Sequence, residues 1–337
     1  MTNFKYDAAF YEAFDEEERL LKKFLPGKLT AYFTWKSIQE DSPGEIPPAP
    51  IISTRTQSKI PLGWSGHLKG IITRSTGYDH ITEYLRETRK TISCAYLPDY
   101  AARAVAEQAM MLWTVLLRNL SAQRSSLGNF HRDGLTGREI RGKNISVIGV
   151  GRIGGELVDI ASGLGMKVRG VDITPREEMI KKYSIEYLPM DDALKCADIA
   201  VCALPLTKIT RGMLDYNRLS TVPKGAIFIN IARGEISPSQ DILRLLDEGK
   251  LGGVGLDVYD YEKEMAAVLR DGMKIESLRP EARESVSATI ALMKHPRAVL
   301  TPHNAFNTIE SVERKCMRTA ENLESFLNNG KFITPCP

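Results

Sequence analysis

The segment Asn144-Ile-Ser-Val-Ile-Gly-Val-Gly-Arg-Ile-Gly154 carries the most information in this chain of 337 residues. Its first half, Ile145 to Ile148, is a short apolar run typical of a buried parallel strand. Three glycines then form the pattern G-x-G-x-x-G, and residues 156–164 continue with the apolar spacing of a helix. A strand, a glycine turn and a helix in this order present the helix N-terminus to phosphate groups. The segment therefore predicts a dinucleotide-binding unit.

Each glycine of the motif has a separate task in such a unit. Gly149 permits the tight turn, Gly151 lets the backbone approach a pyrophosphate, and Gly154 allows the helix to pack close to the strand. A second apolar run, Lys167–Val171, ends at Asp172, about twenty residues further on. A carboxylate there accepts hydrogen bonds from the adenosine ribose and repels a 2′-phosphate, so we expect NAD and not NADP. The alternative is a glycine-rich turn in a fold that binds nothing.

Composition limits the class of protein. The length is sufficient for two domains with separate cores. The net charge is +3 without a run of Lys or Arg, so nucleic acid is not expected, although a mildly basic site suits an anionic substrate. The five cysteines lack C-x-x-C spacing and predict reduced thiols, with neither disulfides nor a metal site. Because no apolar run is long enough to span a bilayer or serve as a signal peptide, we expect a soluble, cytoplasmic protein without a membrane partner.

Short β-like runs alternate with helical patterns along the chain, which is typical of α/β folds with parallel sheets. We predict two Rossmann-like or flavodoxin-like domains: residues 1–99 with 299–337 form a substrate domain, and residues 100–298 form an NAD-binding domain. A ligand would then bind in a cleft between the domains, at the carboxyl ends of the strands. The strands expected in the first domain are Phe4–Ala9, Leu29–Thr34, Pro50–Arg55, Gly70–Arg74 and Thr91–Ala95.

Three polar side chains follow strand-like runs beyond the glycine motif. Arg233 comes after the run Ala226–Ile229, and a guanidinium there can grip a carboxylate at two points and polarise a neighbouring carbonyl. Glu262 follows Gly255-Leu-Asp-Val-Tyr259, and His303 lies in Leu300-Thr-Pro-His-Asn-Ala305. An imidazole beside a carboxylate can hold a proton near neutrality and deliver it to a developing alkoxide. With a nicotinamide, these groups suffice to reduce a 2-oxo acid.

Each of these residues also has a simpler interpretation. An Arg after a strand is commonly a salt-bridge residue, and the His of a Thr-Pro-His turn commonly has no catalytic role. Glu262 lies in an acidic stretch that would normally be solvated. Their joint occurrence, in this order after the glycine motif, favours the catalytic interpretation.

Motifs along most of the chain resemble those of the D-isomer-specific 2-hydroxyacid dehydrogenases. They are Ser75-Thr-Gly-Tyr-Asp-His80, Val105-Ala-Glu107, the glycine motif with Asp172, Ala203-Leu-Pro-Leu-Thr207, Asn230-Ile-Ala-Arg-Gly234, Gly255-Leu-Asp-Val-Tyr259 and Thr301-Pro-His-Asn-Ala305. Tyr96 and the continuation Phe306-Asn-Thr308 resemble the D-lactate dehydrogenase branch. The resemblance implies the two-domain fold, with the first and last segments forming the substrate domain.

The resemblance also implies roles for individual residues. His303 would be the acid/base, Glu262 would orient its imidazole, and Arg233 would clamp the substrate carboxylate and carbonyl. The implied substrate-binding positions are Thr76, Gly77, Tyr78 and Tyr96, in addition to Arg233. The implied cofactor-binding positions are Gly149, Gly151, Arg152, Ile153, Gly154, Asp172, Pro205, Ala232 and Asp257.

Two segments remain open at this point. The stretch between Glu262 and His303 is longer than in many members of the family and contains an expected helix over Pro280–Lys294; it can be a lid, a dimer contact or a spacer. The apolar helix Ala101–Leu120 is explained equally well by burial or by a dimer interface, and the resemblance favours a homodimer.

The expected function is NAD-dependent interconversion of a small 2-oxo acid and a D-2-hydroxy acid by hydride transfer. The alternative from another class is an NAD(H)-sensing dimeric binding protein, similar to a co-repressor, with little turnover. Formate or phosphite oxidation on the same fold is a rival among enzymes, and Glu262 beside His303 argues against formate. The sequence does not indicate which 2-oxo acid is the substrate.

Overall fold

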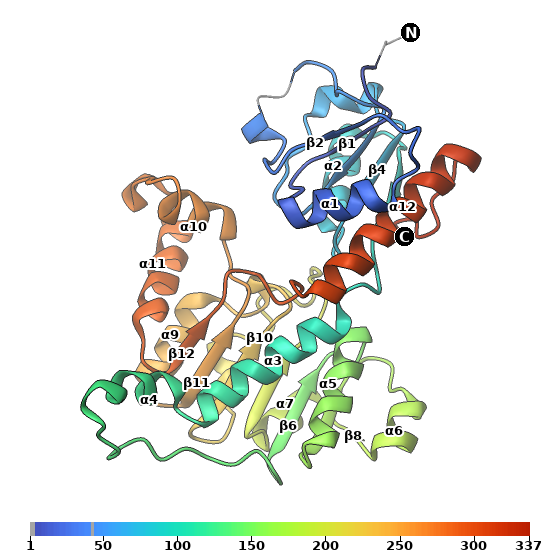
Figure 1. The fold of residues 1–337 in the computed structure, drawn as a ribbon. Helices are drawn as coiled ribbons and strands as arrows, with labels where there is room; N and C mark the ends of the chain where they lie inside the picture. Colours follow the sequence, from blue (N-terminus) through green and yellow to red (C-terminus); the bar gives the residue numbers. More distant parts are fainter. Residues whose placement is uncertain (1–3, 42–43) are drawn as a thin grey trace. The chain divides into compact units, whose positions relative to one another are not determined.

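Two parallel β-sheets organise the chain, each in its own unit (Figure 1). The computed structural model describes residues 4–41 and 44–337. The first unit comprises the chain up to Ala101 together with Asn307–Pro337, and the second comprises Ala102–Phe306. Parallel sheets with helices between the strands confirm the predicted α/β class.

The first unit has a five-stranded sheet of order β2-β1-β3-β4-β5. Its strands are short and largely buried, which suits strands covered on both faces. The first strand begins four residues later than expected, at Ala8 instead of Phe4. The strands are β1 (Ala8–Phe10), β2 (Ala31–Phe33), β3 (Ile51–Thr54), β4 (Gly70–Thr73) and β5 (Ser93–Ala95), and the helices are α1 (Asp15–Phe24), α2 (Asp79–Thr88) and α12 (Ile309–Asn329).

The second unit has a seven-stranded parallel sheet of order β12-β11-β10-β9-β6-β7-β8. Its strands are β6 (Asn144–Ile148), β7 (Lys167–Val171), β8 (Glu186–Tyr187), β9 (Ile199–Cys202), β10 (Ala226–Asn230), β11 (Leu251–Leu256) and β12 (Ala298–Leu300). Its helices are α3 (Ala102–Leu117), α4 (Leu120–Ser126), α5 (Arg152–Gly163), α6 (Glu177–Tyr183), α7 (Met190–Lys195), α8 (Tyr216–Leu219), α9 (Ser239–Asp247), α10 (Glu262–Leu269) and α11 (Pro280–Lys294). The strand order changes direction between β6 and β9, and doubly wound sheets bind their ligands at such a switch point.

The return to the first unit lies later in the chain than expected. Residues 299–306 were assigned to the substrate domain, but β12 pairs in parallel with β11, with Val299 opposite Gly255 and Leu300 opposite Leu256. These hydrogen bonds hold residues 299–306 in the second unit, and the chain leaves that unit after Phe306. The first unit thus resumes at Asn307, eight residues after the predicted boundary, because Ala298–Leu300 forms the last strand of the large sheet.

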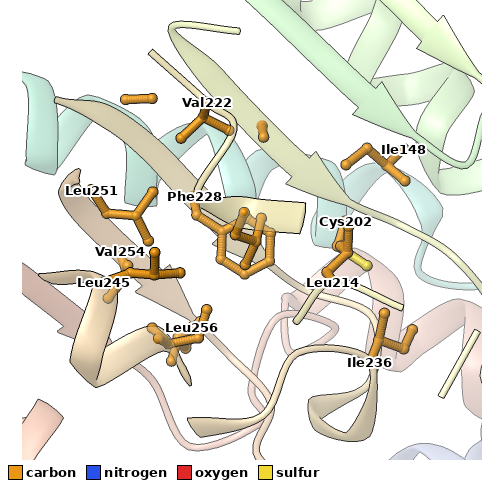
Figure 2. Packing of buried hydrophobic residues seen from close by; sticks show 14 of the residues in the cluster. Ile148, Cys202, Leu214, Val222, Phe228, Ile236, Leu245, Leu251, Val254 and Leu256 are labelled. Atoms are coloured by element: carbon orange, nitrogen blue, oxygen red, sulfur yellow. The ribbon is translucent and has the colours of Figure 1, made fainter. Parts of the chain in front are cut away.

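An apolar core fills the space beside β9, β10 and β11 (Figure 2). Phe228 of β10 is fully buried at its centre, and Val254 of β11 and Leu245 of α9 pack in the same cluster. Burial of side chains of this size stabilises the sheet by roughly 1.5–3 kcal/mol each. This rigid support fixes where the carboxyl ends of the strands lie.

Helix α3 packs against α5 and β11 inside the second unit, on the same side of the sheet as α5 (Figure 1). Leu112 and Trp113 are fully buried. The apolar character of this helix is thus explained by burial. Within the described part of the chain, no helix is both long enough and apolar enough to cross a membrane.

Candidate active site

One row of residues crosses the large sheet just before its strands end. Val171 lies opposite Ile148, Ile148 opposite Cys202, and Cys202 opposite Asn230. The row continues from Asn230 to Leu256 and from Leu256 to Leu300. Every residue predicted to bind cofactor or perform catalysis in this unit follows a member of the row by at most six positions. The parallel sheet therefore collects the predicted residues at one edge.

The glycine loop has the geometry that its sequence predicts. Gly149 has φ +96°, and a Cβ there would lie 2.8 Å from the Ala203 carbonyl oxygen. A Cβ on Gly154 would lie 1.9 Å from the Gly149 oxygen, so both positions require glycine. A Cβ on Gly151 would meet no protein atom within 4 Å. The open side of Gly151, at the N-cap of α5, fits the approach of a pyrophosphate.

Asp172 faces this loop from the end of β7. Its Oδ2 accepts a hydrogen bond from the Val150 backbone N–H at 2.7 Å, and its Oδ1 accepts one from Thr174 N–H at 3.1 Å. Arg176, which the sequence analysis did not single out, donates to the Gly151 carbonyl at 3.2 Å. Its position four residues after Asp172 was the available signal.

The other predicted cofactor positions also lie at the edge of the sheet. Arg152 and Ile153 begin α5 directly after the glycine turn. Pro205 is exposed after β9, and its carbonyl accepts the Thr210 hydroxyl at 2.7 Å. Ala232 is buried after β10, where its N–H donates to Asn230 Oδ1 at 2.9 Å. These contacts fix the loops that follow β9 and β10.

His303 and Glu262 form a pair, with Nδ1 2.9 Å from Oε2. Both side chains are about one third exposed, so the imidazole is within reach of a ligand. His303 has φ +50° and Tyr261, next to Glu262, has φ +56°. Left-handed backbone at residues other than glycine costs free energy and gathers at functional sites. The intervening stretch therefore does not separate the two members of the pair, because β11 and β12 are neighbours.

Asp257 is buried and holds the turn that carries His303. One carboxylate oxygen accepts the Thr301 hydroxyl at 2.5 Å and the Asn304 N–H at 2.9 Å, and the other accepts the Ala305 N–H at 2.9 Å. Burial raises the pKa of Asp257, and these hydrogen bonds oppose the rise. Gln108 of α3 donates to the Thr301 hydroxyl at 3.1 Å and so supports the same turn. Nothing in the sequence pointed to Gln108.

Arg233 follows β10, the neighbour of β11, and is partly exposed. Its Nη1 donates to the Ala232 carbonyl at 2.8 Å. Asn230 Nδ2 donates to the Arg233 carbonyl at 2.9 Å and fixes the backbone of this loop. Burial raises the pKa of the nearby Glu235, against the opposing effect of Arg211 and Arg233. The site therefore contains a guanidinium and a histidine–carboxylate pair at one sheet edge.

In the first unit, the loop after β4 holds the other predicted positions. The Ser75 hydroxyl donates to the Gly77 carbonyl at 2.6 Å, and the Thr76 hydroxyl donates to the Leu97 carbonyl at 3.1 Å. Among the described residues, none accepts a hydrogen bond from the backbone N–H of Thr76, Gly77 or Tyr78. The Tyr78 and Tyr96 rings meet edge to face, with centroids 4.9 Å apart. The loop thus offers backbone donors beside an aromatic pair.

Residues 109–305 match the family model described as "D-isomer specific 2-hydroxyacid dehydrogenase, NAD binding domain". The chain is 32% identical to 2-hydroxyacid dehydrogenase A of Aspergillus oryzae, over 78% of this chain and 73% of the relative. It is 33% identical to an aromatic 2-oxoacid reductase of Clostridium sporogenes, over 77% and 76%. The crystal structure of D-lactate dehydrogenase from Aquifex aeolicus, complexed with NAD and lactic acid, superposes with a TM-score of 0.84 at 26% identity, covering 97% of this chain and 99% of that one.

Fold, glycine loop and family match together define an NAD-binding oxidoreductase. The family model covers more than half of the chain, so the protein belongs to the D-isomer specific 2-hydroxyacid dehydrogenase family. Membership of the family and likeness to its D-lactate dehydrogenase branch were predicted from the motifs and are confirmed. The alternative of an NAD(H)-sensing binding protein is not favoured, because the relatives named above are all enzymes.

Proposed function

We propose that the protein reduces a small 2-oxo acid to the D-2-hydroxy acid with NADH, and catalyses the reverse reaction with NAD. The observation that carries this proposal is the 2.9 Å contact between His303 and Glu262. The pair lies after β12 and β11, at the same edge of the sheet as Arg233 after β10 and the glycine loop after β6. Two relatives support the substrate class: one is named an aromatic 2-oxoacid reductase, and another was crystallised with lactic acid. Formate oxidation needs no such proton donor.

His303 is proposed to be the acid/base. In the reductive direction its imidazolium gives a proton to the substrate oxygen, and in the oxidative direction the neutral ring accepts one. Glu262 faces Nδ1, so it stabilises the charged ring and leaves Nε2 to meet the substrate. Bound NAD(H) supplies the hydride acceptor or donor at the nicotinamide ring.

Arg233 is proposed to bind the substrate carboxylate and polarise the carbonyl, since a guanidinium donates two parallel hydrogen bonds to a carboxylate. We also propose that the backbone N–H groups of Thr76, Gly77 and Tyr78 bind the substrate, with Tyr96 beside them. The unpartnered donors of this loop support that role. Two-point binding of the carboxylate presents one carbonyl face to the hydride, which is the physical basis of the proposed D-specificity.

The proposed homodimer draws support from exposed apolar side chains on the segment after α3. Leu127 and Phe130 are 70% and 75% exposed, and Leu120 of α4 is 42% exposed. Apolar groups gathered on one short segment commonly mark an interface. The proposed location is cytoplasmic, in keeping with five cysteines that are all free thiols.

Oxidation of NADH by a panel of 2-oxo acids, with chiral analysis of the product, tests the proposal. We expect D-2-hydroxy acid from the wild-type protein and a kcat at least about 100-fold lower in His303→Ala, with unchanged NADH affinity. His295→Ala removes the histidine beside Asp247 in the same unit and serves as the control. An L-product, or a His303→Ala variant with full activity, would refute the assignment.

A further inference from the structure

The turn between β11 and α10 contains a buried carboxylate that the mechanism does not use. Asp260 is 7% exposed and lies two residues before Glu262, with the left-handed Tyr261 between them. A buried carboxylate is costly unless hydrogen bonds compensate the loss of water. Whatever binds Asp260 therefore also determines where this turn lies, and the turn positions Glu262.

A chain of two hydroxyls reaches Asp260 from two helices. Ser239, the first residue of α9, donates its hydroxyl to Asp260 Oδ1. Thr289 of α11 donates to Ser239 Oγ at 3.0 Å and lies 3.1 Å from the Ser285 carbonyl. Ser239 is 2% exposed and Thr289 is fully buried. Both hydroxyls are buried away from water. Loss of one of them therefore leaves a buried polar group without its hydrogen-bond partner.

The same turn is in direct contact with the loop that carries Arg233. A Cβ on Gly234 would lie 1.8 Å from the Tyr259 carbonyl carbon and 2.1 Å from the Asp260 nitrogen. The two backbones therefore touch, and neither can move toward the other. The position of the Asp260 turn thus affects Arg233 as well as Glu262.

We propose that Asp260, Ser239 and Thr289 form a hydrogen-bonded relay. This relay holds Glu262 beside His303 and fixes the position of the loop that carries Arg233. In this relay Asp260 is the positioning residue, and α11 supplies the outermost hydroxyl. The long stretch between Glu262 and His303, which contains α11, then supports the site structurally. The inference rests on the proposed roles of His303, Glu262 and Arg233.

The chain offers a close control for this relay. Thr319 of α12 is also a fully buried helical threonine whose hydroxyl donates to the carbonyl four residues earlier, Lys315, at 2.7 Å. Thr289 differs in its additional bond to Ser239. Thr289→Val and Thr319→Val therefore remove the same group from similar surroundings, and the relay is broken only by the first.

Steady-state kinetics with a 2-oxo acid and NADH give the first test. For Thr289→Val we expect kcat to fall about tenfold, KM for NADH to stay within about twofold, and the high-pH limit of reductive activity to move to lower pH. Thr289→Ser should restore the wild-type values, and Thr319→Val should keep them. Equal losses in Thr289→Val and Thr319→Val, or wild-type kinetics in Thr289→Val, would overturn the relay.

The NMR spectrum of the His303 imidazole gives a test that needs no turnover. Glu262 Oε2 lies 2.9 Å from Nδ1 of this ring. A displaced Glu262 lengthens this contact, so the Nδ1 chemical shift should change in Thr289→Val and Asp260→Asn, and stay unchanged in Thr319→Val. An unchanged Nδ1 chemical shift in the first two variants refutes the relay. A protein that reduces no 2-oxo acid but shows the change in chemical shift would refute only the proposed function.

Discussion

At the scale of single residues, the three glycines of the motif meet two different requirements: space for the protein's own backbone and space for a ligand. Gly149 and Gly154 are needed by the protein itself, because a Cβ at either position would collide with backbone. Gly151 is different, since a Cβ there would meet no protein atom within 4 Å. Its lack of a side chain serves the ligand and not the fold.

This difference predicts opposite behaviour for two alanine variants. Gly151→Ala should fold with a melting temperature within about 2 °C of wild type but lose most of the stabilisation by NADH. That stabilisation is about 2.7 kcal/mol at one hundred times Kd. Gly154→Ala should be destabilised without any ligand, because α5 must move away from β6. Thermal melts with and without NADH measure both effects. A Gly151→Ala variant with a full NADH response would contradict the role given to the open side of this glycine.

At the scale of elements, α1, the end of β4 and α12 meet at a buried charge cluster in the first unit. Glu17 accepts hydrogen bonds from Lys315 and, at 3.1 Å, from Arg74, while Arg55 approaches it to 3.8 Å. Burial alone would raise the pKa of Glu17, but the facing cations lower it to about 2. Burial lowers the pKa of Lys315 to about 8, against the effect of Glu17. Arg74 lies two residues before Thr76, so the cluster also anchors the proposed substrate loop Thr76–Tyr78.

Removal of the Glu17 charge should therefore destabilise the first unit strongly. Glu17→Gln leaves buried cations without their partner, and we expect a loss of about 3–5 kcal/mol in the free energy of unfolding at pH 7. A carboxylate with a lowered pKa stabilises fully above its ordinary pKa near 4.5 and loses this contribution as the pH falls toward 2. The difference between wild type and Glu17→Gln should consequently shrink over this range in denaturant titrations.

The exposed neighbour provides the control. Glu18 pairs with Lys22 at the surface, so Glu18→Gln should change stability by less than about 1 kcal/mol at any of these pH values. If Glu17→Gln were as mild as Glu18→Gln, the cluster would have no structural role.

At the scale of the whole molecule, the proposed dimer can be tested through the mass of the protein in solution. Leu127→Glu combined with Phe130→Glu should convert a dimer into a monomer, because charges replace apolar groups in the proposed interface. Sedimentation velocity at micromolar concentration measures the change. Ile309→Glu adds a charge at another exposed apolar position and should leave the dimer intact. A wild-type protein that sediments as a monomer would contradict the proposal.

The α/β class, the glycine loop and the family can be predicted from the amino-acid sequence, because each depends on short-range patterns. The run Ile145–Ile148 and three glycines suffice to predict a strand, a turn and a helix, since spacing reports local backbone conformation directly. Three residues carry too little periodicity to predict that Ala298–Leu300 closes a sheet, so the predicted boundary lies at residue 299 and not after Phe306.

The assembly of the site, in contrast, depends on contacts between segments that are distant in the chain. Glu262 and His303 are 41 residues apart in the chain, and their contact exists because β11 and β12 are adjacent in the sheet. The relay of Asp260, Ser239 and Thr289 joins three elements with unrelated local patterns. Hydrogen bonds between distant segments leave no periodic trace in a sequence, since each residue satisfies only its own local geometry until the chain folds.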